Sequence, residues 1–149
     1  MKAVIQRCKN ASVIVENKTV GKIECGLLVF VGIFNNDTKK AAEILAGKIV
    51  NLRVFSDDND KMNLSVLNTG GSVLVVSNFT LCADTKKGTR PSYSHAMIPD
   101  KANEMYEYFC KCLENKGVKT EKGVFGADMQ VNAQGDGPVT VILDTDIWL

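Results

Sequence analysis

Apolar residues occur along most of this chain in short runs or at alternate positions, a pattern typical of β-strands. The run 26–34 is almost continuously apolar and predicts a central strand that is covered on both faces. The run 72–79 is the strongest strand pattern in the chain. In total the pattern predicts strands over 3–5, 11–15, 19–24, 26–34, 52–55, 72–79, 118–125, 129–131 and 139–147.

Two stretches have helical periodicity instead. The first begins after Asp37, a suitable N-cap, and its apolar positions repeat every three to four residues up to Leu52. The second begins at Pro99, which is favoured at the first position of a helix, and should end at Gly117. Its apolar stripe consists of Ala102, Met105, Tyr106, Phe109 and Leu113.

The order of these elements limits the fold class. Strands, a helix, strands, a second helix and further strands do not form the regular alternation of a doubly wound sheet. We therefore predict a β-rich α+β fold, with largely antiparallel or barrel-like sheets and two main helices packed on the sheet. A length of 149 residues, without an internal repeat or linker, predicts one domain over 1–149.

Composition and charge exclude several functional classes. The chain is 45% apolar and 23% charged, as in ordinary globular proteins. No apolar run approaches the ~20 residues of a membrane helix, and Gln6 and Arg7 interrupt any secretory leader. We therefore predict a cytoplasmic protein without a membrane partner. The net charge of +1 provides no global attraction to nucleic acid, so any RNA contact must be local.

The residue types that usually carry metals or cofactors are scarce. The five cysteines contain no CxxC pair and are predicted to be reduced thiols. Cys110 and Cys112 point to different faces of the second helix, and the acidic turn 57–60 lacks the glycine of a calcium loop. We predict neither a metal nor a cofactor. Cys82 as a nucleophile with His95 as its base is a further candidate, although nothing in the sequence indicates that the two residues meet.

Only two clusters of basic residues occur, Lys39 with Lys40 and the segment 86–90. Each can be a solvated surface or a contact for phosphate. The tRNA-binding candidates of the second cluster are Lys86, Lys87 and Arg90.

Two stretches with polar residues or Gly-Pro are hard to explain by a structural role alone. The stretch 77–81 (Ser-Asn-Phe-Thr-Leu) places polar side chains at the end of an apolar strand, where burial without partners is unfavourable. The stretch 135–140 (Gly-Asp-Gly-Pro-Val-Thr) predicts a turn before the last strand. A cis peptide bond at Pro138 costs only ~0.5–1 kcal/mol.

Taken together, these motifs closely resemble the D-aminoacyl-tRNA deacylases of bacteria and eukaryotes. The likeness runs through nearly the whole chain in order, over 3–7, 11–13, 26–29, 55–57, 61–64, 70–77, 90–92, 125–129 and 137–140. Two positions depart from the family pattern. Asn78 stands where the family usually has glutamine, and Gly135 stands where it usually has asparagine.

The resemblance implies a homodimer that hydrolyses the ester between a D-amino acid, or glycine, and the 3′ end of tRNA. It implies catalytic groups at Ser77, Asn78, Phe79 and Thr80. A cis Gly137-Pro138 loop would enter the partner's site and exclude L side chains. The remaining implied residues support the pocket or the loop, and they are Arg7, Phe125, Ala127, Met129 and Thr140.

Three alternatives remain open from the sequence. Thr80 can act as a covalent nucleophile, although no base for it is evident. The chain can be a generic esterase that uses Ser77, Thr80 or Cys82. It can also be a non-enzymatic RNA-binding domain that uses the basic segment 86–90.

Overall fold

The fold is organised around one long strand, β1 (Lys2–Val15). The computed structural model describes all residues from 1 to 149. Two separate strands, 3–5 and 11–15, were the expectation from the pattern, and that expectation is wrong. The polar residues between them stay extended because β1 has a neighbouring strand on each side, with β8 along one edge and β3 and β2 along the other.

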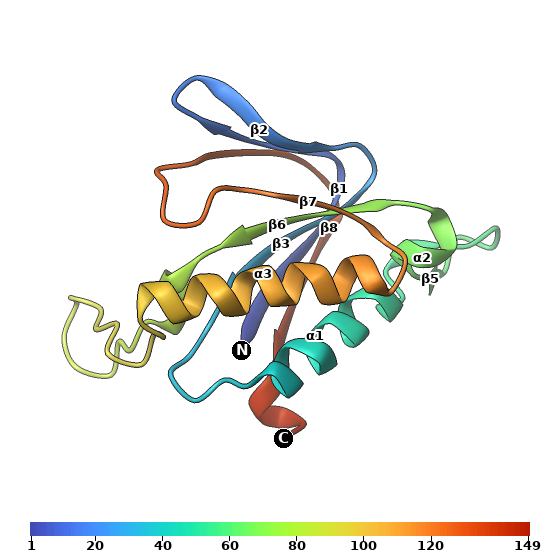
Figure 1. Ribbon diagram of the computed structural model, residues 1–149. Coiled ribbons are helices and arrows are strands. Elements are labelled where there is room, and N and C mark those ends of the chain that lie inside the picture. Colours follow the sequence, from blue (N-terminus) through green and yellow to red (C-terminus); the bar gives the residue numbers. More distant parts are fainter.

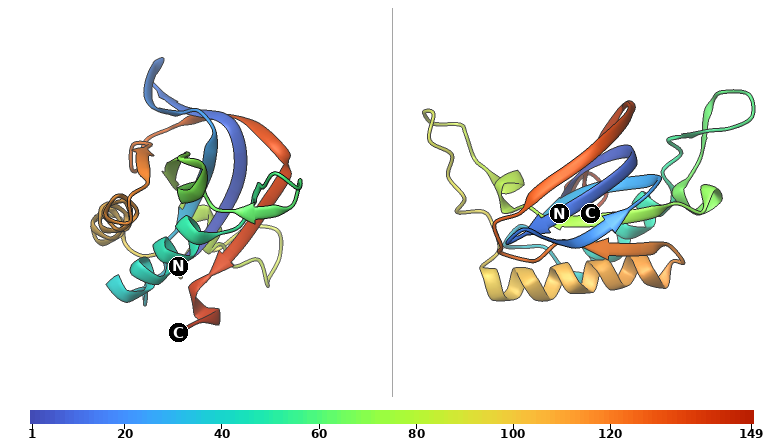
Figure 2. Two further views of the ribbon diagram at one scale, coloured as in Figure 1. Left: turned by 90° about the vertical axis from the view of Figure 1, so that its right-hand side faces the viewer. Right: turned by 90° about the horizontal axis from the view of Figure 1, so that it is seen from above.

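The main sheet is curved into a nearly closed, barrel-like form (Figures 1 and 2). Its other strands are β2 (Lys18–Ile23), β3 (Gly26–Gly32), β6 (Ser72–Ser77), β7 (Lys119–Lys122) and β8 (Gln130–Asp144). All three pairings of β1 are antiparallel, whereas β3 with β6 and β6 with β7 are parallel. The predicted α+β, barrel-like class is confirmed, and the sheet is mixed in its centre.

Two helices cover one face of this sheet, as predicted (Figure 2). They are α1 (Lys39–Asn51) and α3 (Pro99–Asn115). Their apolar stripes, with Leu45 and Phe109 fully buried, pack on the inward side chains of β1, β3 and β6. A smaller cluster fills the hollow side of the sheet around Val13 and Leu74. The barrel therefore has a core on each side of its strands.

The N-cap of α1 was predicted wrongly. Thr38 caps the helix through its side chain, which accepts a hydrogen bond from the Ala41 N–H. The carboxylate of Asp37 is already engaged, because it accepts from the buried amino group of Met1 and from the Phe34 N–H. A salt bridge to the chain terminus therefore takes the residue that the sequence pattern assigns to capping.

Several predicted strands are shorter or joined differently in the structure. The segment 52–55 contributes only β4 (Phe55–Ser56), which pairs with β5 (Met62–Leu64) across the acidic turn. After β5 lies a short helix, α2 (Val66–Thr69), with a capping box at Ser65, in a segment for which the pattern predicts neither a helix nor a strand. The segments 129–131 and 139–147 belong to the single strand β8, which ends at Asp144 before a 3-10 turn, η2 (Thr145–Ile147).

β3 and β6 end two residues earlier than the pattern predicts. After Asn78, whose N–H donates to the Val31 carbonyl, the chain bends into a 3-10 turn, η1 (Phe79–Cys82). Gly32 makes this bend possible, since a Cβ there would lie 2.8 Å from the Cβ of Leu81. The polar stretch 77–81 is thus a turn at the carboxyl end of a central strand.

None of the helices is long and apolar enough to cross a membrane. All five cysteines are free thiols, and four of them, including Cys110 and Cys112, are buried. No group of three or more histidine, cysteine or acidic side chains comes together in a way that would hold a metal ion.

Candidate active site

A cavity of about 670 Å³ opens at the carboxyl ends of β3 and β6. Four segments of the chain form its walls: the end of β3 at 30–33, the strand end and turn at 76–79, the loop and helix start at 93–102, and the connection at 125–131. Thirteen of its seventeen lining residues are hydrophobic. The cavity is therefore a mainly apolar pocket with a few polar groups at one end, as is usual for small-molecule sites.

The polar end of the cavity comes from the stretch 77–79. Ser77 and Asn78 line it and are half-buried. Asn78 does not cap η1 with its side chain, so the N–H groups of Phe79 and Thr80 at the start of this turn lack a side-chain partner. The side chain of Asn78 instead accepts a hydrogen bond from the Thr80 hydroxyl.

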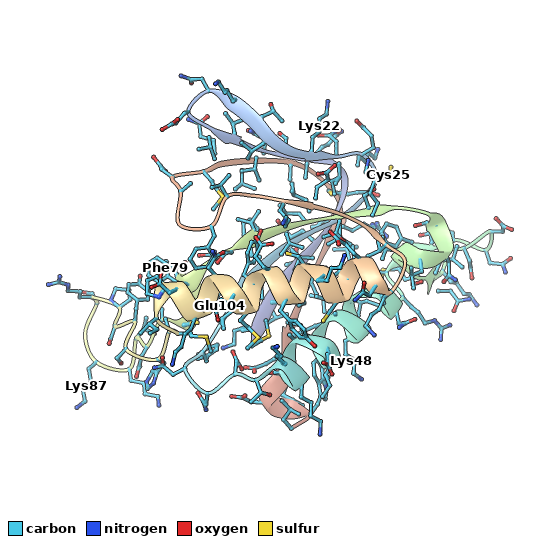
Figure 3. All side chains as sticks on the ribbon, viewed as in Figure 1. Lys22, Cys25, Lys48, Phe79, Lys87 and Glu104 are labelled. Carbon is cyan, nitrogen blue, oxygen red and sulfur yellow. The ribbon has the colours of Figure 1, made fainter.

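Aromatic rings form the mouth of the cavity. Phe79 is 58% exposed, and its ring packs edge-on against Tyr93 with 5.0 Å between centroids. In Figure 3 Phe79 lies near the end of α3 that begins at Pro99. A large exposed ring beside an apolar pocket is a surface on which a planar group can stack.

Basic side chains lie in the loop that leads from this mouth. The loop 83–98 projects from one end of the molecule, and Lys87 points outward from it (Figures 1 and 3). Lys86, Lys87 and Arg90 are all exposed. The base of the loop is held by paired backbone bonds between Asp84 and Ser92. The basic tip therefore extends from the same segment that supplies Tyr93 to the cavity.

The Gly137-Pro138 bond lies in an irregular stretch of β8 and is cis. The predicted turn is wrong, because the strand continues on both sides of it. Gln6 pairs with Thr140 and Cys8 with Gly135, so residues 136–139 bulge opposite Arg7 alone.

Arg7 fills the space under this bulge. Its Nε donates to the Asp136 carbonyl at 2.9 Å, and its Nη1 donates to the Val54 carbonyl at 2.6 Å. The Asp136 carboxylate lies 3.4 Å from the same Nε. The Arg7 side chain, only 13% exposed, thus ties the bulge to the segment after α1.

The structure brings together some of the sequence-predicted residues and separates others. Ser77, Asn78 and Phe79 line the cavity, as do Phe125, Ala127 and Met129. Thr80 does not line the cavity, but its hydroxyl donates a hydrogen bond to Asn78, which does. Gly137, Pro138 and Thr140 are exposed on β8 and do not line the cavity of their own chain.

Sequence reasoning missed most of the apolar wall. Its members come from the sheet, the segment before α3, the first turn of α3 and the connection before β8, and they are Phe30, Ile33, Val76, Tyr93, Ala96, Met97, Ile98, Pro99, Ala102, Gly126 and Val131. Tyr93 and Met97 were apolar residues without periodicity next to the 90–92 motif, a signal that could have placed them at a pocket.

The geometry weakens two of the alternatives. Burial raises the pKa of Cys82 to about 11, and its thiol donates to the Ile33 carbonyl, so this thiol stays protonated at neutral pH. The imidazole of His95 lies 3.6 Å from the Asp84 carboxylate, and the Cys82 thiol bonds to the Ile33 carbonyl instead of to this imidazole. Neither Ser77 nor Thr80 has a hydrogen-bonded base.

The acidic turn is a hairpin in which Asp57 accepts from the N–H groups of Asn59 and Lys61.

Comparison with known proteins places this site in a family. The sequence profile of the D-Tyr-tRNA(Tyr) deacylases matches residues 4–144. The chain belongs to that family of hydrolases. A D-aminoacyl-tRNA deacylase of Thermosipho africanus is 55% identical over 145 residues, 97% of each chain. One from Yersinia pestis is 54% identical over 140 residues, covering 94% of this chain and 97% of the relative.

Solved structures agree with this assignment of the fold. A c-Myc DNA unwinding element binding protein superposes with a TM-score of 0.90 at 40% identity, covering 97% of this chain and 98% of its own. A probable eukaryotic D-amino acid tRNA deacylase superposes with a TM-score of 0.82 at 16% identity, covering 95% and 97%. The second likeness concerns the fold alone.

Proposed function

We propose that this deacylase hydrolyses the ester that joins a D-amino acid, or glycine, to the 3′-terminal adenosine of tRNA. The observation that carries the proposal is the cavity itself. Its polar end is made of the 77–79 motif, its walls are apolar, and a basic loop leads away from its mouth. An aminoacyl-adenosine has a matching shape, with a flat base, a reactive ester and a phosphate backbone that continues outward.

The reaction needs little from side chains because an aminoacyl ester is already activated. Water adds to the carbonyl carbon, the bond to ribose O3′ breaks, and O3′ takes up a proton. The free N–H groups of Phe79 and Thr80 would hold the negative charge that develops on the carbonyl oxygen. Since no base is hydrogen bonded to Ser77 or Thr80, we assign the activation of water to the adjacent ribose 2′-hydroxyl.

The test uses D-tyrosyl-tRNA that ends in either adenosine or 2′-deoxyadenosine. We expect rapid release of D-tyrosine from the first and at least a ~100-fold slower release from the second. Equal rates would support a generic esterase. Binding of either tRNA without hydrolysis would support a non-enzymatic nucleic-acid-binding domain. The 40% identical structural neighbour is named for binding a DNA unwinding element.

We also propose that the Gly137-Pro138 segment acts in the cavity of a second subunit. In its own chain this segment is exposed and does not line the cavity, which supports a role across a homodimer interface. Such an interface would bury at least ~1,000 Å² in total. Rigid backbone beside the substrate Cα leaves room for hydrogen but not for an L side chain, so glycine is accepted.

Mixed dimers distinguish a loop that acts in the cavity of its partner from a loop that acts in the cavity of its own chain. In Gly137→Ala the new Cβ would lie 2.5 Å from the Val139 nitrogen at a φ of +143°, so the segment must distort and the D-over-L ratio should fall. Asn78→Ala is paired with it as the chain with the impaired cavity. The heterodimer is purified through two different tags. The Gly137→Ala chain then supplies an intact cavity and the Asn78→Ala chain an intact loop. These two meet only if the loop crosses the interface. Recovery of the D-over-L ratio supports the proposal, and a ratio as low as in Gly137→Ala overturns it.

A further inference from the structure

The hydrogen bond between Thr80 and Asn78 leaves the two side chains with different free groups. Thr80 has one hydroxyl proton, and it is donated to Oδ1 of Asn78. Asn78 lines the cavity and is half-buried, whereas Thr80 is exposed and does not line it. The Nδ2 group of Asn78 makes no hydrogen bond to the protein, so its two N–H donors are the part of the amide that is available to a ligand.

Resting on the proposed function, we infer that Asn78 Nδ2 is a further donor to the ester carbonyl and that Thr80 is a positioning residue that sets the direction of this amide. A primary amide can turn about its last torsion and present either an acceptor or donors to the cavity. In the structure the Thr80 hydroxyl donates to Oδ1, so the amide stands with its oxygen toward Thr80. The N–H donors then face the other way.

This arrangement depends on the length of the side chain at position 78. The asparagine amide is within reach of a hydroxyl two residues later because it is separated from the backbone by a single methylene. A glutamine would carry its amide one carbon further from the backbone, so we expect the pair to be loosened or lost in glutamine, which the family usually has at this position.

The chemistry fits the direction of the donors. Negative charge grows on the carbonyl oxygen as water adds, so a fixed N–H helps more in the transition state than in the ground state. Loss of one such donor typically slows a reaction about 10²–10³-fold. Loss of the hydroxyl that orients the donor should cost less, about 10-fold in kcat, because the amide remains and still visits the productive orientation.

The experiment is a double-mutant cycle on D-tyrosyl-tRNA hydrolysis. Thr80→Val removes the hydroxyl and keeps the shape, and we expect kcat to fall about 10-fold with KM changed less than ~2-fold. Thr80→Ser restores the donor and should recover kcat to within ~3-fold. In the Asn78→Ala background, Thr80→Val should cost less than ~2-fold, since the amide that it orients is gone.

Two further variants test the donor separately. Asn78→Asp keeps an acceptor for Thr80 but has no N–H and adds a negative charge beside the developing oxyanion, so it should lower kcat at least as much as Asn78→Ala does. In the Asn78→Gln background, Thr80→Val should again cost less than ~2-fold. A readout without turnover is the NMR signal of the Asn78 side-chain NH₂, which should shift in Thr80→Val and return in Thr80→Ser.

Several results would overturn the inference. An equal loss from Thr80→Val in the wild-type and Asn78→Ala backgrounds, or an acyl group trapped on Thr80, would give Thr80 a chemical role of its own. Full activity of Asn78→Asp would exclude the donor. Inactivity of the unmodified enzyme on D-tyrosyl-tRNA, with the NMR shift present, would refute the proposed function and remove the catalytic role while leaving the hydrogen bond in place.

Discussion

Replacing Arg7 should damage both stability and stereoselectivity, because this one side chain supports the Gly137-Pro138 bulge. Arg7→Ala removes hydrogen bonds to the Asp136 and Val54 carbonyls, both made by a largely buried cation. Arg7→Lys keeps the charge but replaces a planar fork with a point donor that can serve only one of the two carbonyls.

The expected magnitude follows from these contacts. A hydrogen bond to a charged group contributes about 1.5–3 kcal/mol. Two of them would give roughly 3–6 kcal/mol, and hydration of the released carbonyls returns part of this, so we expect about 3 kcal/mol lower free energy of unfolding for Arg7→Ala. The ion pair to the Asp136 carboxylate, which is 40% exposed, adds about 0–1 kcal/mol. Arg7→Lys should lose about half as much.

Urea denaturation measures the first effect, and hydrolysis of D- and L-tyrosyl-tRNA measures the second. With a slope of about 1–3 kcal/mol per molar urea, the midpoint of Arg7→Ala should fall by roughly 1–3 M. Lys9→Ala is the matched control, an exposed cation on the same strand that makes no hydrogen bond or ion pair. An unchanged midpoint, or a lower midpoint with an unchanged D-over-L ratio, would refute the bracing role.

Other features give simpler predictions. Iodoacetamide at pH 7 should label the exposed Cys25 and leave Cys82 unmodified, because burial raises the pKa of Cys82 to about 11; mass spectrometry of the digest decides this. The pKa of Asp84 is lowered, chiefly by the N–H of Lys86, so its support of the loop is present above pH 3.8 and is lost as the pH falls below that value. The protection factor of the Lys86 amide, which compares its exchange rate with that of an unstructured chain at the same pH, should fall on acidification in the wild type and stay constant in Asp84→Asn. The affinity for tRNA should fall with salt, and Lys87→Ala should reduce the slope of log K against log salt by about one, the contribution of one phosphate contact. An unchanged slope would exclude such a contact.

The fold class followed from the sequence because it depends on local periodicity. Both main helices and the central strands were predictable from their apolar spacing, and Pro99 marked the start of α3 correctly. The errors concern residues whose state depends on partners distant in sequence. β1 continues through Arg7 and Lys9 because β8 pairs with it. Asp37 does not cap α1 because the amino group of Met1 occupies its carboxylate.

From the residue pattern alone, the candidate site was predictable only where polar residues interrupt an apolar run, whereas Phe125, Ala127 and Met129 came from the family resemblance. Ser77 and Asn78 were evident for this reason, whereas Phe30 and Val76 carry no signal that separates a pocket wall from a core. The hydrogen bond from Thr80 to Asn78 could also not be predicted from the sequence, since two polar residues two positions apart give no side-chain directions. The geometry of the turn after β6 decides this contact.

The most direct test of the account compares D-tyrosyl and L-tyrosyl esters on the same tRNA with the unmodified enzyme. The account predicts that the D ester is hydrolysed with a kcat/KM at least about 100-fold higher than the L ester, a difference of roughly 2.7 kcal/mol in transition-state free energy. Glycine on its own tRNA should be hydrolysed as well. Equal rates for the two tyrosyl esters, or no hydrolysis of the D ester above the spontaneous rate, would contradict the account.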